Sequence, residues 1–138
     1  VTYDRIRQII NNEESKQKKI DQIAENRMKI QTNPSMDLVR DIDTILECLN
    51  FNSSTINILR NGIGKNSLTL TEFMDSIISK EIKNMDFFED VPAFRIKHIG
   101  LGTLLKLLKQ VTDCHFSKEF DKEFERRIAS AMAFGFLK

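Results

Sequence analysis

Tryptophan is absent from this chain of 138 residues, and the residues that make tight turns are scarce, with 2 prolines and 5 glycines. A fold made of many short strands needs frequent turns, which rely on glycine and proline. The scarcity therefore argues against an all-β architecture. Leucine, isoleucine, lysine, glutamate and asparagine dominate instead. We expect one all-α domain over residues 1–138, folded as an irregular bundle of about five to six helices.

Neither sign of charge prevails, because the chain has 21 Lys and Arg residues and 20 Asp and Glu residues, for a net charge of +1. A dedicated nucleic-acid binder is usually more basic, since its affinity comes largely from neutralising phosphates. The balance makes such a role less favoured, although a local basic patch is compatible with it. The chain also lacks an apolar run of about 18 or more residues, so we expect no membrane partner.

Cysteine is scarce too. Cys48 and Cys114 are too few for a disulfide framework and form no C-x-x-C motif. Reduced thiols in a cytoplasmic or nuclear protein fit best, so we expect an intracellular location. The chain begins at Val1 rather than at methionine, which indicates a fragment of a larger protein or a processed chain.

Candidate catalytic and metal-binding groups are few. His115 adjoins Cys114, and adjacent side chains do not readily chelate one ion, while His98 is remote in sequence. Acidic pairs such as Glu13-Glu14 and Glu89-Asp90 lie in polar segments, whereas general acid–base catalysis needs a carboxylate in a dry pocket. We therefore expect a protein that is not an enzyme and has no metal and no cofactor.

Residues 3–31 have the spacing of one long helix that is apolar at both ends and polar between. The polar middle is residues 11–19. Apolar side chains recur every three or four positions on either side of it, namely Tyr3, Ile6, Ile9, Ile10, Ile20, Ile23, Ala24, Met28 and Ile30. Two alternatives stay open: a break near Asn11–Asn12, or a continuous helix whose middle projects into water. Residues 1–33 can in either case be semi-independent of the rest.

The middle of the chain is divided by proline, asparagine and glycine. Asn33-Pro34-Ser35 should end the first helix, because proline disfavours helical backbone at the residue before it. The spacing of apolar residues predicts a helix over about 36–50. A short helix should follow, capped by Ser53 or Ser54 and ended at Gly62, which is free to adopt a positive φ.

The second half contains three more predicted segments. Thr71 should cap an amphipathic helix. Pro92 forbids a continuous helix, so residues 86–102 are expected to form a long connecting loop. A strongly apolar helix should run from Thr103 to about Asp113, and Ser117 should cap a last helix over about 118–137.

The stretch GIGK, residues 62–65, invites a nucleotide-binding interpretation that its neighbours exclude. A phosphate-binding loop needs G-x-x-x-x-G-K followed by serine or threonine. The first glycine position is Leu59 here, and Asn66 follows the lysine. A dinucleotide fingerprint fails as well, since Ser67 stands where its third glycine belongs.

Two family resemblances remain for this stretch. Gly62-Ile63-Gly64 resembles the turn of a helix-hairpin-helix motif, and the segment around Gly100-Leu101-Gly102 resembles a second copy. The resemblance implies that backbone N–H groups bind a nucleic-acid phosphate. The residues it implicates are Gly62, Gly64, Lys65, Gly102 and Lys106. Lys106 departs from the motif, which has an apolar residue at that position.

The second resemblance is to the N-terminal helical-bundle domain of transcription elongation factors. It rests on Leu46, Leu49, Thr55, Ile56, Leu59 and Ile63-Gly64-Lys65. It implies a docking domain for short disordered motifs, but the tryptophan-containing helix of that family is missing. The simplest interpretation is that Gly62 caps a helix, Ile63 anchors the loop, Gly64 turns the chain and Lys65 is solvated.

Surplus apolar residues suggest the function. Among ten phenylalanines, Phe87, Phe88 and Phe94 fall in the predicted loop, and Ile6 and Ile10 lie on the first helix. We expect these five to bind a partner helix, a short motif or a second copy of the chain. The expected role is a non-enzymatic protein–protein interaction or scaffolding module of a larger assembly. Nucleic-acid binding through the glycine turns is the alternative.

Overall fold

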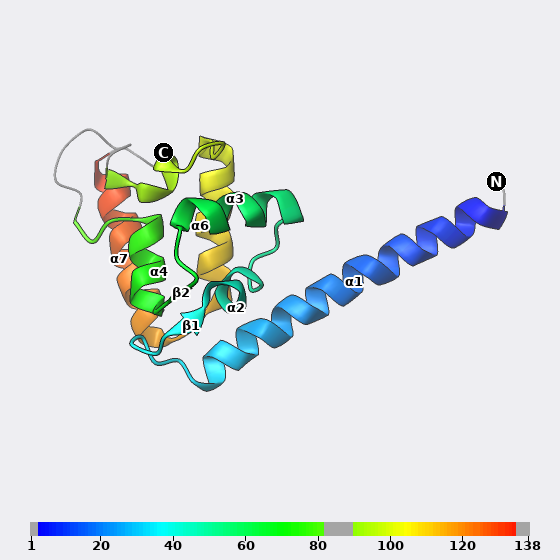
Figure 1. The fold of residues 1–138 in the computed structure, drawn as a ribbon, viewed down its shortest axis with the longest axis horizontal. Helices are drawn as coiled ribbons and strands as arrows, with labels where there is room; N and C mark the ends of the chain where they lie inside the picture. The colour runs from blue at the N-terminus through cyan, green and yellow to red at the C-terminus, as the bar shows by residue number, and fades with distance from the viewer. Residues whose placement is uncertain (1–2, 82–89, 135–138) are drawn as a thin grey trace.

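The computed structural model of the chain describes residues 3–81 and 90–134. Six α-helices lie in these ranges: α1 (Tyr3–Thr32), α2 (Ile42–Leu46), α3 (Ser53–Ile63), α4 (Leu70–Ile77), α6 (Leu101–Cys114) and α7 (Lys118–Ala133). A 3-10 turn, η1 (Pro92–Arg95), and two short strands, β1 (Arg40–Asp41) and β2 (Ser67–Leu68), complete the described part. The predicted all-α fold is confirmed. Figure 1 shows a packed body from which α1 extends as a straight arm.

The core of the body is built from side chains that recur at helical spacing. On α7, Phe120 and Phe124 are four residues apart and stack with ring centroids 5.8 Å apart. Phe116 meets Phe120 edge to face at 5.3 Å. These rings pack with buried side chains of α4 and α6, such as Phe73 and Leu107, in one continuous cluster. Burial of this apolar surface is the main term that holds the helices together.

Helix ends follow the local signals in part. Ser117 caps α7 as predicted, accepting a hydrogen bond from the N–H of Phe120 at 3.0 Å. The predicted cap Thr71 is wrong, because Thr69 caps α4 and forms a reciprocal capping box with Glu72. The prediction that Ser53 or Ser54 caps α3 is also wrong, since Asn52 does so. Each true cap is the polar side chain with extended backbone just before the helix.

The predicted helix over residues 36–50 is wrong. β1 pairs antiparallel with β2, Arg40 opposite Leu68 and Asp41 opposite Ser67. The Asp41 carboxylate then accepts the N–H of Asp43 and begins α2, which ends at Leu46. The backbone groups of residues 40–41 are therefore bound to a strand distant in sequence. Local apolar spacing contains no information about that pairing.

The segment expected to be a long loop ends earlier than predicted. α6 begins at Leu101, two residues before the predicted start at Thr103, with Gly100 in extended backbone as its N-cap. Within the described part of this segment, η1 forms one short turn that begins at Pro92. Proline is favourable there, because the first turn of a helix does not need its missing N–H.

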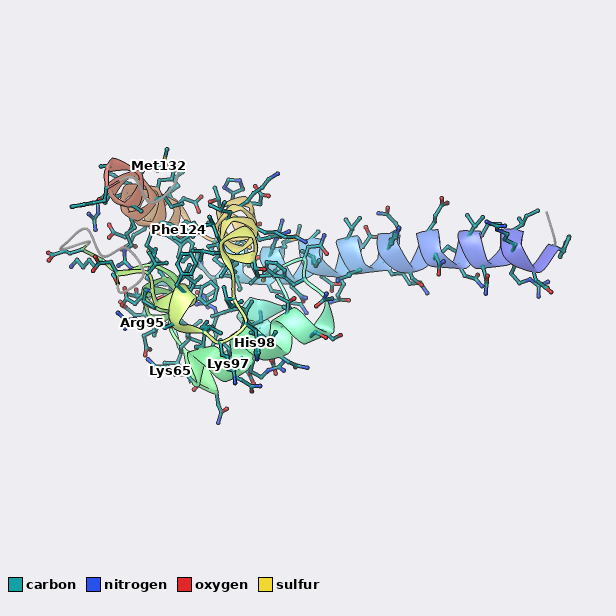
Figure 2. The ribbon with its side chains drawn as sticks, turned by 90° about the horizontal axis from the view of Figure 1, so that it is seen from above. Lys65, Arg95, Lys97, His98, Phe124 and Met132 are labelled. Carbon is teal, nitrogen blue, oxygen red and sulfur yellow. The ribbon has the colours of Figure 1, made fainter. Side chains whose placement is uncertain are left out.

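α1 is one continuous helix and ends at Thr32, just before Asn33-Pro34. No break occurs at Asn11–Asn12, so the alternative of a projecting helix is the correct one. In both views the helix runs clear of the body over most of its length (Figure 1, Figure 2). Within the ranges described, no helix combines the length and apolarity that crossing a membrane would require.

Candidate functional site on the projecting helix

α1 divides into two parts by exposure. Every residue from Tyr3 to Gln22 is exposed, and we call this segment the arm. At about 1.5 Å per residue, its twenty residues span about 30 Å. The rest of the helix contains the buried Ile23, Asn26 and Ile30. The arm is thus exposed along its whole length, and only its inner end, with Lys19 and Gln22, lies beside the body in the described part of the chain.

Hydrogen bonds fix the inner part of α1 to the body. The Arg27 guanidinium donates to the carbonyl of Cys48 at 2.9 Å, and the Gln31 amide donates to the carbonyl of Cys114 at 2.8 Å. The Lys19 ammonium donates to the carbonyl of Phe51 at 2.8 Å. The Cys48 carbonyl lies just after α2 and the Cys114 carbonyl at the end of α6, where a helix leaves acceptors without partners, whereas Phe51 lies just before the N-cap of α3. The arm therefore leaves the body from a well-anchored base.

Two different faces of α1 are apolar. Successive residues are about 100° apart around a helix, which places the body-facing Ile23 and Ile30 on one side. A second line of residues is rotated away from Ile23 around the axis, by about 60° at Ile20 and by about 160° at Tyr3. We call it the free stripe, and its members are Tyr3, Ile6, Ile10, Ile20 and Ala24. Their exposed fractions include 79 % for Tyr3, 50 % for Ile10 and 53 % for Ile20. The free stripe therefore does not serve the core.

The structure places the predicted docking residues in three different situations. Ile6 and Ile10 lie on the free stripe, with exposed fractions of 47 % and 50 %. Phe94 is partly buried and packs against the core, because η1 turns it inward. Phe87 and Phe88 lie outside the described residues. The sequence predicted that Ile20, Ile23 and Ala24 together resume the stripe of Ile6. The structure divides this set, since Ile23 is buried whereas Ile20 and Ala24 are exposed.

The base of the free stripe borders a hollow between α1 and α6. Ile20, Ile23, Ala24 and Arg27 line it from α1, Asn50 from the segment between α2 and α3, and Gln110 and Asp113 from α6. We call it the basal hollow, and its volume is about 260 Å³. Arg27 and Gln110 are joined across it by a hydrogen bond of 3.3 Å. An incoming helix that follows the free stripe toward the body would meet this hollow.

The two glycines of GIGK have distinct structural roles. Gly64, with φ at +70°, is the left-handed C-cap of α3, and its N–H donates to the carbonyl of Arg60. The prediction that Gly62 caps the helix with positive φ is wrong. Gly62 lies inside α3, where a Cβ would come within 2.5 Å of Ile96 Cγ2. Ile63, as predicted, packs partly buried against the core.

The cations of the nucleic-acid alternative already have partners. Lys65 forms an ion pair of 2.7 Å with Glu72, and the Lys106 ammonium lies over the Phe51 ring at 5.4 Å from its centroid. A Cβ on Gly102 would have no neighbour within 4 Å, unlike one on Gly62, so the two glycine turns are not equivalent. Figure 2 shows where Lys65 and Lys97 lie on the body. Nucleic-acid binding at these turns stays a prediction.

A cleft of about 820 Å³ lies between α4 and α7 and is lined by both apolar and charged side chains. Arg127, only 3 % exposed, donates to Asp75 at 2.6 Å, to Glu123 at 3.1 Å and to the carbonyl of Ile78 at 3.0 Å. Hydrogen bonds from Arg126, and then from Arg127, lower the pKa of Glu123 to about 2 despite some desolvation. Glu123 is therefore ionised at neutral pH and suits an ion-pair network better than a general acid.

The thiols and histidines form no reactive group in the described residues. Cys48 and Cys114 are both free and fully buried. Burial raises the pKa of each thiol to about 12, which disfavours the reactive thiolate. His115 ends α6 and contacts Asp121 through Nδ1 at 3.2 Å on the surface. In the same ranges, three or more His, Cys, Asp or Glu side chains nowhere converge as a metal site would require.

Comparisons with known proteins add no relative to this picture: no protein family, no curated protein and no solved structure matches the chain.

Proposed function

We propose that this chain is a non-enzymatic protein-interaction module of a larger intracellular assembly, and that the free stripe of α1 is its docking surface. The main support is a run of twenty helical residues, 3–22, that are all exposed yet carry Tyr3, Ile6, Ile10 and Ile20 along one line. Isolated large apolar side chains are ordinary on a surface, but an aligned set on a projecting element is typical of a binding site.

Physical chemistry favours a helical partner. A helix of about twenty residues without tertiary contacts is marginal in water, because most helical stability in proteins comes from a buried face. The polar segment 11–19 offers no such face to the body. Burying one isoleucine fully contributes about 1.5–3 kcal/mol, so several along one line can offset the entropy lost on association. A second helix laid along the free stripe would supply that burial.

The test is cross-linking and mass spectrometry in the native source, with the wild type compared to Ile6→Glu/Ile10→Glu. The matched control is Gln8→Glu/Asn12→Glu, which adds the same two charges at the same spacing on the opposite face. We expect the stripe variant to lose its cross-linked partners and the control to keep them. Equal retention by both variants would refute the proposal, and equal loss would show that the stripe is not the contact.

A further inference from the structure

We propose that the helix that occupies the free stripe is the arm of a second copy of this chain, packed antiparallel about a two-fold axis at Ser15. This inference rests on the proposed function and specifies its partner. The two folded bodies would then lie at opposite ends of a two-stranded coiled coil. Two features of α1 carry the proposal: the heptad spacing of the free stripe, whose positions pair symmetrically about Ser15, and its charge.

Spacing along the stripe is that of a coiled-coil seam. The positions Tyr3, Ile6, Ile10, Glu13, Gln17, Ile20 and Ala24 are separated by alternating steps of three and four residues. These steps are the a and d positions of a heptad repeat, whose side chains meet those of a facing helix. The seam is apolar at both ends and polar at its centre. It belongs to the free stripe and not to the body-facing side, where Ile23 and Ile30 are buried.

The seam has a centre of symmetry at Ser15. Ile10 lies five residues before it and Ile20 five after, while Ile6 lies nine before and Ala24 nine after. In an antiparallel pair centred at Ser15, Ile10 therefore packs on Ile20 of the second copy. Ile6 packs on Ala24 of the second copy, so a large side chain faces a small one. Each contact occurs twice, as a two-fold interface requires.

Charge selects the antiparallel orientation. Glu13 and Glu14 precede Ser15, whereas Lys16, Lys18 and Lys19 follow it. Antiparallel pairing places Glu13 of one copy opposite Gln17 of the other and beside its Lys16, which lies on the same flank of the interface. A parallel pair in register would instead bring Glu13 against Glu13 of the second copy inside the seam. Like charges at such close range oppose association, so the sequence disfavours the parallel dimer.

The basal hollow gives the far end of the second arm a place to bind. In this register, Tyr3 of the second copy comes level with Arg27, which lines the hollow together with Gln110 and Asp113. An aromatic ring fits a space of about 260 Å³ that has apolar walls from Ile20 and Ala24. A guanidinium beside a ring adds a favourable cation–π contact. Tyr3, 79 % exposed within one copy, would thereby become buried.

The oligomeric state is the first measurement, by sedimentation equilibrium of the full chain. We expect a dimer for the wild type and for Gln8→Glu/Asn12→Glu, and a monomer for Ile6→Glu/Ile10→Glu. Reversing one charge, as Lys16→Glu, should weaken the dimer, and the exchange Glu13→Lys/Lys16→Glu should restore it. Restoration would exclude misfolding as the reason for the loss. If the exchange variant dissociates further, the charge argument fails.

Orientation is tested by disulfide cross-linking of variants that each carry one added cysteine on the free stripe. A mixture of Ile10→Cys and Ile20→Cys should give a mixed disulfide on oxidation, whereas each variant alone should cross-link poorly. Efficient cross-linking of each variant with itself would indicate a parallel pair and overturn the antiparallel arrangement. The native Cys48 and Cys114 should not interfere, since both are fully buried.

The outcomes separate this inference from the proposed function. A chain that stays monomeric, yet captures a native partner that Ile6→Glu/Ile10→Glu loses, refutes the second copy and leaves the docking stripe in place. A chain that is monomeric and has no stripe-dependent partner refutes both. An antiparallel dimer that depends on the stripe supports both together.

Discussion

Position 62 needs glycine because the neighbouring Ile96 leaves no room for a side chain there. Ile96, which follows η1, packs so closely on α3 that a Cβ on Gly62 would lie 2.5 Å from Cγ2 and 2.7 Å from Cγ1 of Ile96. Real Cβ atoms do not approach carbon this closely, so a substitution must displace Ile96 or the turn that holds it. Gly64 is needed for another reason, its φ of +70°, which side-chain-bearing residues adopt at a cost.

Replacing Gly62 with alanine should destabilise the fold. Alanine favours a helix by up to about 1 kcal/mol over glycine, but overpacking costs about 1–3 kcal/mol, so we expect a net loss near 1 kcal/mol. Chemical denaturation measures it. Gly102→Ala is the matched control, since nothing lies within 4 Å of its would-be Cβ and the helix propensity should act alone. A stabilised Gly62→Ala would contradict the close contact with Ile96.

The Glu123 carboxylate should make the free energy of unfolding depend on pH in the acid range. Its folded pKa, about 2, is held below the unfolded value of about 4.3 by hydrogen bonds from Arg126 and then Arg127. The sign is that of a depressed acid: the contribution is complete above about pH 4.3 and is lost as the pH falls toward about 2. As the pH falls through this window, the midpoint temperature of unfolding should therefore drop more steeply for the wild type than for Glu123→Gln. Parallel curves would show that the ion pairs contribute nothing.

At the scale of elements, α4 and α7 are joined by an ion-pair network around one buried cation. Arg127 is 3 % exposed and reaches Asp75 on α4, the carbonyl of Ile78 just beyond it and Glu123 on its own helix. Asp75 is still 52 % exposed, so water shares in solvating that carboxylate. Arg126, its neighbour, is 48 % exposed and pairs with Glu123 at 2.7 Å from the solvent side.

Arg127→Met should cost more stability than Arg126→Met. The first change leaves the Ile78 carbonyl and two carboxylates without their buried donor, which we expect to cost about 2–3 kcal/mol. The second removes an exposed pair, which double-mutant measurements generally find weak. Urea unfolding of both variants gives the comparison. Equal losses would mean that burial of Arg127 does not strengthen its contacts.

At the scale of the whole molecule, α1 serves both the body and the surroundings. Its inner third carries Ile23 and Ile30 into the core, and its outer twenty residues carry the free stripe into solvent. A rigid connection between the two parts matters for recognition, because a pre-ordered helix loses less entropy on binding than a disordered segment does. The hydrogen bonds at the base of α1 supply that order.

Truncations should separate the two functions of α1. Removing residues 1–21 should leave the unfolding midpoint of the body nearly unchanged and abolish association. Removing residues 1–32 also deletes Ile23 and Ile30, which should cost about 3–5 kcal/mol. Differential scanning calorimetry and sedimentation measure the two effects. A body that unfolds equally easily after both deletions would instead show that residues 1–33 are independent of it, as the sequence allows.

The sequence by itself determined the helical class, the end of α1 before Pro34 and the Ser117 cap of α7. These follow from periodicity, proline geometry and a cap bonded to the N–H of Phe120, all of which involve residues close along the chain. It also drew attention to Ile6 and Ile10, because apolar residues recur there at helical spacing beside a segment without a core face.

Only the tertiary structure decided the rest. The strand at Arg40–Asp41 depends on pairing with Ser67–Leu68, and the need for glycine at position 62 depends on Ile96. The division of α1 into two apolar faces depends on which side the body covers, since Ile20 and Ile23 are equally apolar in sequence. Local hydrogen bonds and caps are encoded by neighbours, whereas burial is decided by partners that are distant along the chain until it folds.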